Sequence, residues 1–449
     1  MLPNIHGQHM LNTADRTLLT LAQSLREDGY GALADQIQVW LGGRLNVSVL
    51  RTALARLNHA HPVVTARLSR EKNGSPCWRF RPGAECTLHE TFLPSAREVD
   101  VLREAAAILA APSDPAESDP LVFHLLHLPD GRDLLLVQHD HCLMDINGTK
   151  LLLREINRLS SEQSGPASPA ETCEDGIRSH LRRFSLRQRL AAIWRLGKLS
   201  RDLRRSVPVT LSDATTSMPG GALRIAVREL DEAQTERFTT RTVQLCGFRS
   251  VSLAVLSSVF RAILRHTPRP PSDRSALFVY LGTNLRGPKD GGPIFHNLSS
   301  MLPLLVHPEE MSERDKLIRL LNRQLRERMG ENSDLAFLQW AWWLRNLPRV
   351  QRRPAREVYF RQCVNYGYMG MLAEKGDTFC GAPIERIFPV AQMYSPPALS
   401  VAPSLCGGRL ILPVLYVADT VPEKRIQHFL DTLVADLLEK ESVYEHVTV

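Results

Sequence analysis

The feature that most constrains the fold is a pair of apolar runs joined by a tight turn. LVFHLLHL (121–128) and DLLLVQHDH (133–141) flank Pro129-Asp130-Gly131. Turn residues of this kind between two apolar runs are typical of a β-hairpin. GTKLLLREINRL (148–159) follows with the periodicity of an amphipathic helix. Residues 133–159 are therefore expected to form a strand, a tight turn and a helix.

Strand and helix patterns alternate in both halves of the chain. In 45–64 apolar residues recur every three or four positions, Asn46 or Ser48 can cap the resulting helix, and Pro62 ends it before an extended piece. The second half shows strand patterns at 222–230 and 275–286, helix patterns at 231–246, 250–265 and 312–330, and a strand, turn and closing helix over 414–440. In 449 residues, this alternation predicts an α/β or α+β protein of two lobes.

Three segments divide the chain. We predict an N-terminal lobe over 1–160, a linker and basic helical segment over 161–220, and a C-terminal lobe over 221–449. Within the middle segment, 178–205 is rich in arginine. A solvated basic helix face is the favoured interpretation, and a docking surface for an acidic protein partner is the alternative. The segment contains no recognisable nucleic-acid module, so no nucleic-acid partner is expected.

Composition and end sequences favour an ordinary globular protein. Hydrophobic residues make up 43% and charged residues 23%, and a net charge of +7 is only a weak pointer to an anionic partner. The first residues lack the pattern of a signal peptide, and the apolar stretch 250–264 is interrupted by serine and arginine. The sequence therefore predicts a soluble, cytoplasmic protein without a membrane span.

Several catalytic classes are disfavoured by missing motifs. The eight cysteines are scattered without metal-ligand spacing, so we expect reduced thiols and no metal site. The chain contains no GxSxG nucleophile elbow, no GxxxxGK[ST] loop and no GxGxxG loop. These absences argue against a serine hydrolase, a P-loop enzyme and a dinucleotide-dependent enzyme.

One short segment combines a histidine, a carboxylate and a turn at the end of a strand. His141 stands where the apolar run stops, and Asp145 follows four residues later, just ahead of the next helix. An imidazole held there could remove a proton from a hydroxyl or amine. His139 would share the face of His141 along the strand, whereas Asp140 would point to the other face. Cys142 is expected to be packed, and no ligand spacing supports a metal site at His139, His141 and Asp145.

The order of these features resembles the superfamily of CoA- and carrier-dependent acyltransferases. It includes chloramphenicol acetyltransferase, alcohol acyltransferases, polyketide-associated acyltransferases and the condensation domains of nonribosomal peptide synthetases. The family motif HHxxxDG stands here as Asp140-His141-Cys142-Leu143-Met144-Asp145-Ile146. Segments that are similar to further family elements follow in the same order, at 41–68, 246–264, 284–297 and 364–367.

The resemblance implies two lobes in a V shape with a central tunnel, and a crossover segment in the C-terminal lobe. His141 would act as general base between an acyl thioester and an alcohol or amine acceptor. Acyl-CoA or a phosphopantetheinyl thioester would be the co-substrate, with no permanently bound cofactor. Asp145 would pair with an arginine, for which Arg67 and Arg286 are the candidates. The residues expected in the tunnel are Asp140, Asn284, Asn297 and Asn365.

The motif departs from the family pattern at two positions. Asp140 replaces the first histidine, and together with Asp145 it spells the DxxxxD of heterocyclisation domains. Ile146 replaces the motif glycine, with Gly148 two positions later, and the DFGWG box of the plant enzymes is absent. We predict a stand-alone acyltransferase of secondary metabolism or lipid modification. The alternatives are a catalytically degenerate protein that binds a carrier protein as a scaffold, and a heterocyclisation-type enzyme.

Overall fold

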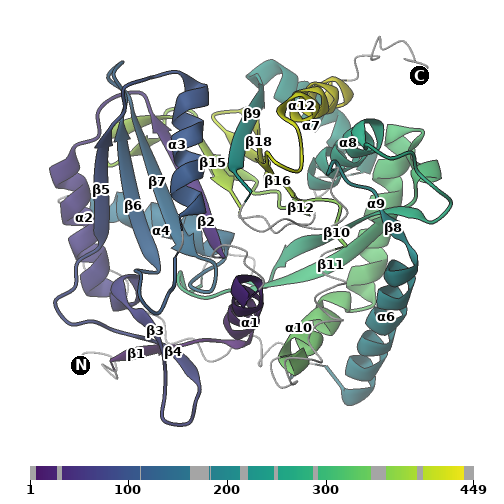
Figure 1. Ribbon diagram of the computed structural model, residues 1–449, viewed down its shortest axis with the longest axis horizontal. Helices are drawn as coiled ribbons and strands as arrows, with labels where there is room; N and C mark the ends of the chain where they lie inside the picture. Colours follow the sequence, from purple (N-terminus) through teal and green to yellow (C-terminus); the bar gives the residue numbers. More distant parts are fainter. Residues whose placement is uncertain are drawn as a thin grey trace.

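Two six-stranded sheets form the centres of two lobes; the first lies at the left of Figure 1 and the second in its upper middle. The computed structural model describes residues 7–27, 33–111, 113–161, 182, 184–212, 221–246, 251–286, 292–344, 361–391 and 398–438. Helices and strands alternate in both lobes, so the predicted two-lobed α/β architecture is confirmed. None of the described helices is both long enough and apolar enough to cross a bilayer.

The first lobe is built on a sheet of strand order β14-β15-β2-β7-β6-β5. β6 (Leu121–His127) and β7 (Asp133–Asp140) pair antiparallel, which confirms the predicted hairpin. β2 (Ala34–Leu41) is the antiparallel neighbour of β7 on its other side, and β5 (Thr87–Phe92) lies at the edge beside β6. α3 (Glu98–Ala110) and α4 (Ile146–Leu159) contact opposite faces of this sheet: Gln36 donates to a carbonyl of α3, whereas His139 contacts Thr149 of α4.

Side-chain caps explain where two helices of this lobe begin. Asn46 accepts hydrogen bonds from the backbone nitrogens of Ser48 and Val49, so α2 (Val47–Ala60) starts after it. α4 begins two residues before the predicted 148, because Asp145 accepts from the nitrogen of Gly148. Downstream of α2, the expected extended piece is a 3₁₀ turn η1 (Pro62–Thr65) followed by β3 (Arg67–Arg70).

The second lobe contains a sheet of order β12-β16-β18-β17-β13, with β9 paired to β18. The predicted strands appear as β9 (Leu223–Leu230), β10 (Ser275–Asn284) and β18 (Arg409–Val417), and the predicted helices as α7 (Glu232–Cys246), α8 (Val251–His266), α9 (Arg314–Gly330) and α12 (Glu423–Leu437). The remaining elements of this half are β8 (Val207–Pro208), β11 (Ser299–Val306), η3 (Pro308–Met311), α10 (Ser333–Leu344), β12 (Asn365–Tyr366), β13 (Met371–Ala373), β16 (Leu399–Val401) and β17 (Ser404–Cys406). α8 is buried along nearly its whole length, because apolar residues occupy more than one face.

A segment from the second half of the chain crosses into the sheet of the first lobe. β14 (Thr378–Phe379) pairs with β15 (Ala382–Val390), and β15 pairs antiparallel with β2. The chain then returns to the second lobe at β16. Arg386 of this crossing strand pairs with Glu98 of α3 and Glu229 of β9, and its guanidinium stacks 4.4 Å from the ring centroid of Trp40. The two lobes therefore share strands as well as side-chain contacts.

One helix and two short strands that the sequence patterns did not indicate, α1 (Thr13–Glu27), β1 (Gln8–Met10) and β4 (Pro76–Arg79), lie near the junction of the lobes. α1 lies between the lobes at the bottom of Figure 1, beside the small sheet of β1, β3 and β4. The basic segment forms α6 (Leu186–Arg205), as predicted. Ser185 and Gln188 form a capping box at the beginning of this helix. Most of the predicted linker, 162–176, lies outside the described residues.

Candidate active site

His141 lies in the turn that follows β7, on the face of the sheet that carries α4. Its backbone nitrogen donates to the carbonyl of Leu33, so the pairing with the strand β2 continues one step past Asp140. Asp35 of β2 stands opposite His139 in the register, which places Asp35, His139 and His141 on one face. The imidazole Nδ1 lies 3.1 Å from Oδ2 of Asp35 and 3.4 Å from the carbonyl oxygen of Met144. The side chain is 25% exposed, so a reactant can approach it from solvent.

The neighbours of Nδ1 determine which nitrogen of His141 carries the proton. A carboxylate oxygen and a carbonyl oxygen can only accept hydrogen bonds. These neighbours favour the neutral tautomer that carries its proton on Nδ1 and its lone pair on Nε2. Within the part of the chain that the structure describes, Nε2 makes no hydrogen bond to protein. This is the arrangement that a general base needs.

Asp145 pairs with Arg286 in a buried ion pair between the two lobes. Nη1 of Arg286 lies 2.6 Å from each carboxylate oxygen, and the two side chains are 3% and 1% exposed. The backbone nitrogens of Gly148 and Leu298 also donate to Asp145, at 2.9 and 2.7 Å. Arg286 donates further through Nη2 to the carbonyls of Pro293 and His296. The Asp145 carboxylate thus holds the start of α4 and the residue that precedes β11.

Gly148 lies where the backbone of the second lobe closely approaches α4. A Cβ atom at 148 would lie 2.3 Å from the carbonyl oxygen of Ile294 and 2.9 Å from Cβ of Met144. Only glycine fits at this position without a backbone shift. The close approach between the second lobe and α4 is therefore at Gly148, two residues after Ile146.

Asn297 connects the backbone of His141 to α1. Its Nδ2 donates to the carbonyl of His141 at 2.8 Å and to Asp15 of α1 at 2.9 Å. Asp15 also accepts from the nitrogen of Asn297 and contacts Nδ1 of His296 at 3.1 Å. Asp15 is buried, and its hydrogen bonds to His296 and Asn297 lower the pKa of the carboxyl despite the opposing effect of burial. Asn297 therefore links the backbone of His141 to Asp15 of α1 through hydrogen bonds.

The structure assigns Arg67 a different partner from the one expected. Arg67 pairs with Asp119, which also accepts from Arg81 at 2.8 Å and from the hydroxyl of Thr87 at 2.5 Å. The expectation that Arg67 could brace Asp145 is therefore wrong. Arg67 and Arg286 were both candidates for the ion pair with Asp145. Arg67 lies in β3 and pairs with Asp119, whereas Arg286 pairs with Asp145.

Three of the residues expected in a tunnel have other surroundings. Asp140 is buried and accepts from the nitrogen of Cys142 at 2.7 Å, and burial raises the pKa of its carboxyl. Asn284 ends β10 and accepts from the nitrogen of Arg286, so it shapes the loop that carries this arginine. Asn365 lies in β12 beside Ser400, and no contact joins it to His141. Of these four expected tunnel residues, Asn297 is the one that hydrogen-bonds to His141.

The other groups of the motif are packed inside the lobe. His139 is fully buried between the carbonyl of Asp140 and the hydroxyl of Thr149, and burial lowers its pKa, so it is neutral. Burial also raises the pKa of the Cys142 thiol well above its usual range. A buried neutral thiol is a poor nucleophile. Among the described residues, no cluster of three histidine, cysteine or carboxylate side chains could hold a metal ion.

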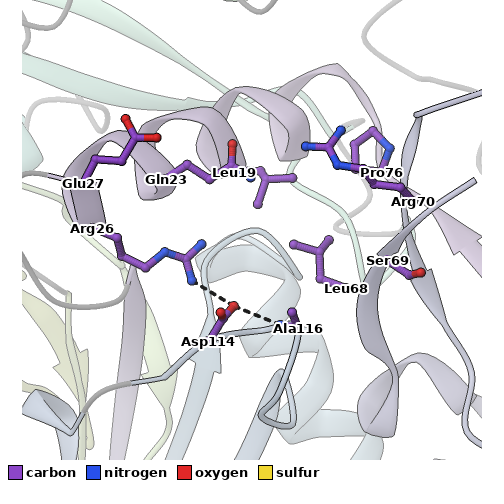
Figure 2. Close-up of a pocket in the computed structure, with 10 residues that line it drawn as sticks. All are labelled: Leu19, Gln23, Arg26, Glu27, Leu68, Ser69, Arg70, Pro76, Asp114 and Ala116. Atoms are coloured by element: carbon purple, nitrogen blue, oxygen red, sulfur yellow. Dashed lines mark hydrogen bonds and ion pairs between the residues drawn. The ribbon is translucent and has the colours of Figure 1, made fainter. Parts of the chain in front are cut away.

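A separate groove of about 470 Å³ lies between α1 and β3 (Figure 2). Arg26, Glu27 and Arg70 line it, and Arg26 donates to Asp114 at 3.1 Å. Neither His141 nor Asp145 lines this groove. The groove is therefore distinct from the candidate active site.

Sequence reasoning missed Asp35 and Asp15, the two acids that contact the site from other elements. Asp35 precedes the apolar residues of β2, which was not predicted, and Asp15 lies in the unpredicted α1. The alternation of Ile37, Val39 and Leu41 on the face of Asp35 is the signal that could have located the strand.

The fold is that of solved condensation domains and of a trichothecene acetyltransferase, as the resemblance implied. The first condensation domain of the CDA synthetase matches 97% of this chain and 96% of its own, with a TM-score of 0.69 and 16% identity. Trichothecene 15-O-acetyltransferase from Fusarium sporotrichioides matches 96% of this chain and 95% of its own, with a TM-score of 0.65 and 13% identity. The starter condensation domain of rhizomide synthetase, solved with C8-CoA, matches 96% and 94%, with a TM-score of 0.66 and 14% identity.

Sequence comparison gives a shorter match, to a plipastatin synthase. One of the plipastatin synthase proteins of Bacillus subtilis is 26% identical over 157 residues, which cover 35% of this chain and 6% of that much longer synthase. No protein-family model matches the chain.

Proposed function

We propose that this protein transfers an acyl group from a thioester to a hydroxyl or amine acceptor, with His141 as general base. The observation that carries the proposal is the imidazole itself: Nδ1 faces two acceptor oxygens at 3.1 and 3.4 Å, and Nε2 has no hydrogen-bond partner among the described residues, on a side chain that is 25% exposed. Nε2 would take the proton of the acceptor O–H or N–H as the oxygen or nitrogen attacks the thioester carbonyl. When the C–S bond of the tetrahedral intermediate breaks, the departing sulfur would receive that proton.

The two substrates would meet between the lobes. Donor and acceptor would enter a central tunnel from opposite sides, so that catalysis consists of proximity and one proton transfer. The starter condensation domain solved with C8-CoA and the 15-O-acetyltransferase support acyl transfer on this fold. The thioester would be a co-substrate, CoA or a carrier-bound phosphopantetheine, with no permanent cofactor. The stand-alone role, the cytoplasmic location and the place in secondary metabolism remain part of this proposal.

Two alternatives receive less support from the site. A heterocyclisation-type enzyme would use the motif aspartates, but Asp140 is buried and bound to the backbone of its own turn. A non-catalytic scaffold is suggested by Ile146, but Gly148 provides the close approach and the pair of Asp145 and Arg286 is intact. We therefore favour catalysis.

The proposal is tested by offering the purified protein a panel of acyl-CoA and acyl-carrier thioesters with mixed alcohols and amines. Mass spectrometry of the products should detect an ester or an amide together with one released thiol per transfer. A panel without any product, from a protein that binds a carrier tightly, would support the scaffold instead.

The outer face of α6 provides a test of the donor class. Leu186, Leu190 and Trp194 recur at intervals of four and are 72%, 54% and 70% exposed. The helix continues with the exposed basic residues Lys198, Arg201, Arg204 and Arg205. If an acidic carrier protein docks on this face, charges at its rim should speed association.

Changing Arg201, Arg204 and Arg205 to glutamate should lower kcat/KM with a carrier-bound donor by about tenfold at low ionic strength, because docking charges become repulsive. Transfer from free acyl-CoA should stay unchanged. The matched control changes Arg319, Arg323 and Arg326 on the exposed face of α9, which alters net charge equally. An equal loss with both donors, or an equal loss in the control, would contradict docking on α6.

A further inference from the structure

The carboxylate of Asp35 faces the imidazole of His141 from a neighbouring strand. The two residues are not near in sequence, and no part of the HxxxD motif includes position 35. Oδ2 of Asp35 lies 3.1 Å from Nδ1 of His141, and the two side chains are 14% and 25% exposed. The contact follows from the register, since His141 continues the ladder opposite Leu33 and Asp35 is two residues further along the same face.

We infer that Asp35 is a positioning residue for the proposed base: it holds the proton on Nδ1 of His141 and stabilises the imidazolium that forms during acyl transfer. The inference rests on the proposed function. An anion beside Nδ1 favours the tautomer whose Nε2 is unprotonated, and it attracts the positive charge that appears when Nε2 takes a proton. Aspartate has this role toward the catalytic histidine of serine proteases, on an unrelated fold.

The other charged groups near His141 do not replace Asp35. His139 shares its face but is buried and neutral. Asp140 belongs to the opposite face and binds the nitrogen of Cys142. Asp145 is compensated by Arg286. Of the described residues, Asp35 is therefore the one that places a carboxylate within hydrogen-bond distance of the His141 ring.

A second contact between aspartate and histidine on the same sheet shows what a purely structural pair looks like. At the far end of β7, Asp133 lies 2.9 Å from Nδ1 of His127. Both oxygens of Asp133 are also bound, one by Arg44 and the other by the nitrogen of Leu45, and the His127 side chain is 7% exposed. The His141 side chain is more exposed, at 25%, and its Nε2 has no hydrogen-bond partner among the described residues, so its contact with Asp35 can influence a reaction.

The substitution Asp35→Asn tests the inference, because it keeps the shape of the side chain and removes the charge. We expect kcat to fall by about 10- to 100-fold, with KM for donor and acceptor nearly unchanged, because the inferred role acts on the imidazole and not on substrate binding. Asp35→Glu retains the charge and should recover part of the rate. Asp130→Asn, in the exposed turn between β6 and β7, is the matched control and should leave kcat unchanged.

A second measurement does not depend on any substrate. In protein with ¹⁵N-labelled histidine at alkaline pH, with His141 assigned by comparison with His141→Ala, Nδ1 should be protonated and Nε2 unprotonated. The Nε2-protonated tautomer should gain population in Asp35→Asn. Wild-type kcat in Asp35→Asn, or an Nε2-protonated His141 in the wild-type protein, would overturn the inference. If the wild-type protein transfers no acyl group, the proposed function fails and the nitrogen shifts alone decide the role of Asp35.

Discussion

Replacing His141 with alanine should lower the rate of acyl transfer by about 10²- to 10⁴-fold, the usual contribution of a positioned acid–base group. The loss should appear in kcat, because the ring acts on the acceptor proton and not on binding. Folding should be largely unaffected, since the polar contacts of the ring with the described residues are those of Nδ1 with Asp35 and Met144. Steady-state kinetics and thermal melting of the same preparation measure both effects.

His307→Ala is a suitable control for this variant. His307 is also partly buried, and its Nδ1 contacts a carbonyl oxygen, that of Ser275, at 3.1 Å. It lies in the second lobe, away from the motif, so its loss should leave kcat unchanged. Turnover of His141→Ala at the wild-type rate would move the reaction to another site.

The second large effect is on stability. Asp145→Ala should lower the free energy of unfolding by about 3–5 kcal/mol, because it leaves the buried guanidinium of Arg286 without its counter-charge. The backbone nitrogens of Gly148 and Leu298 also lose their acceptor. Denaturant unfolding with matched m-values measures the loss.

Two comparisons separate the buried ion pair from a general effect of mutation. Asp130→Ala breaks the exposed pair with Arg132 and should cost about 0–1 kcal/mol. Adding Arg286→Met to Asp145→Ala removes the uncompensated charge and should recover part of the stability. If Asp145→Ala melts like Asp130→Ala, the bracing role of the ion pair is incorrect.

Much of the fold could be predicted from local patterns. The hairpin around Asp130, the capped helix after Asn46 and the buried helix at 251–266 each follow from periodicity, turn residues or caps within a short window. The crossing strand β15 could not be derived from its own residues, because its neighbour β2 lies more than 300 positions earlier in the chain.

In the candidate site, too, some features follow from the local sequence and others depend on contacts between distant segments. The placement of His141 at a strand end and the cap formed by Asp145 follow from the local sequence. The choice of Arg286 over Arg67 and the approach of Asp35 depend on contacts between strands and lobes. Such contacts leave no periodic signal, and residues that meet across a sheet are fixed only when the register is known.

The crossing strand also restricts how substrates can reach the histidine. β15 belongs by sequence to the second half of the chain, yet it is hydrogen-bonded to β2, whose other edge pairs with the strand that leads to His141. A rigid-body swing that parted the halves would have to peel this strand from its neighbour. Under the proposed function, admission of an acyl chain would therefore rely on local rearrangement of loops and side chains around strands that stay paired across the two halves.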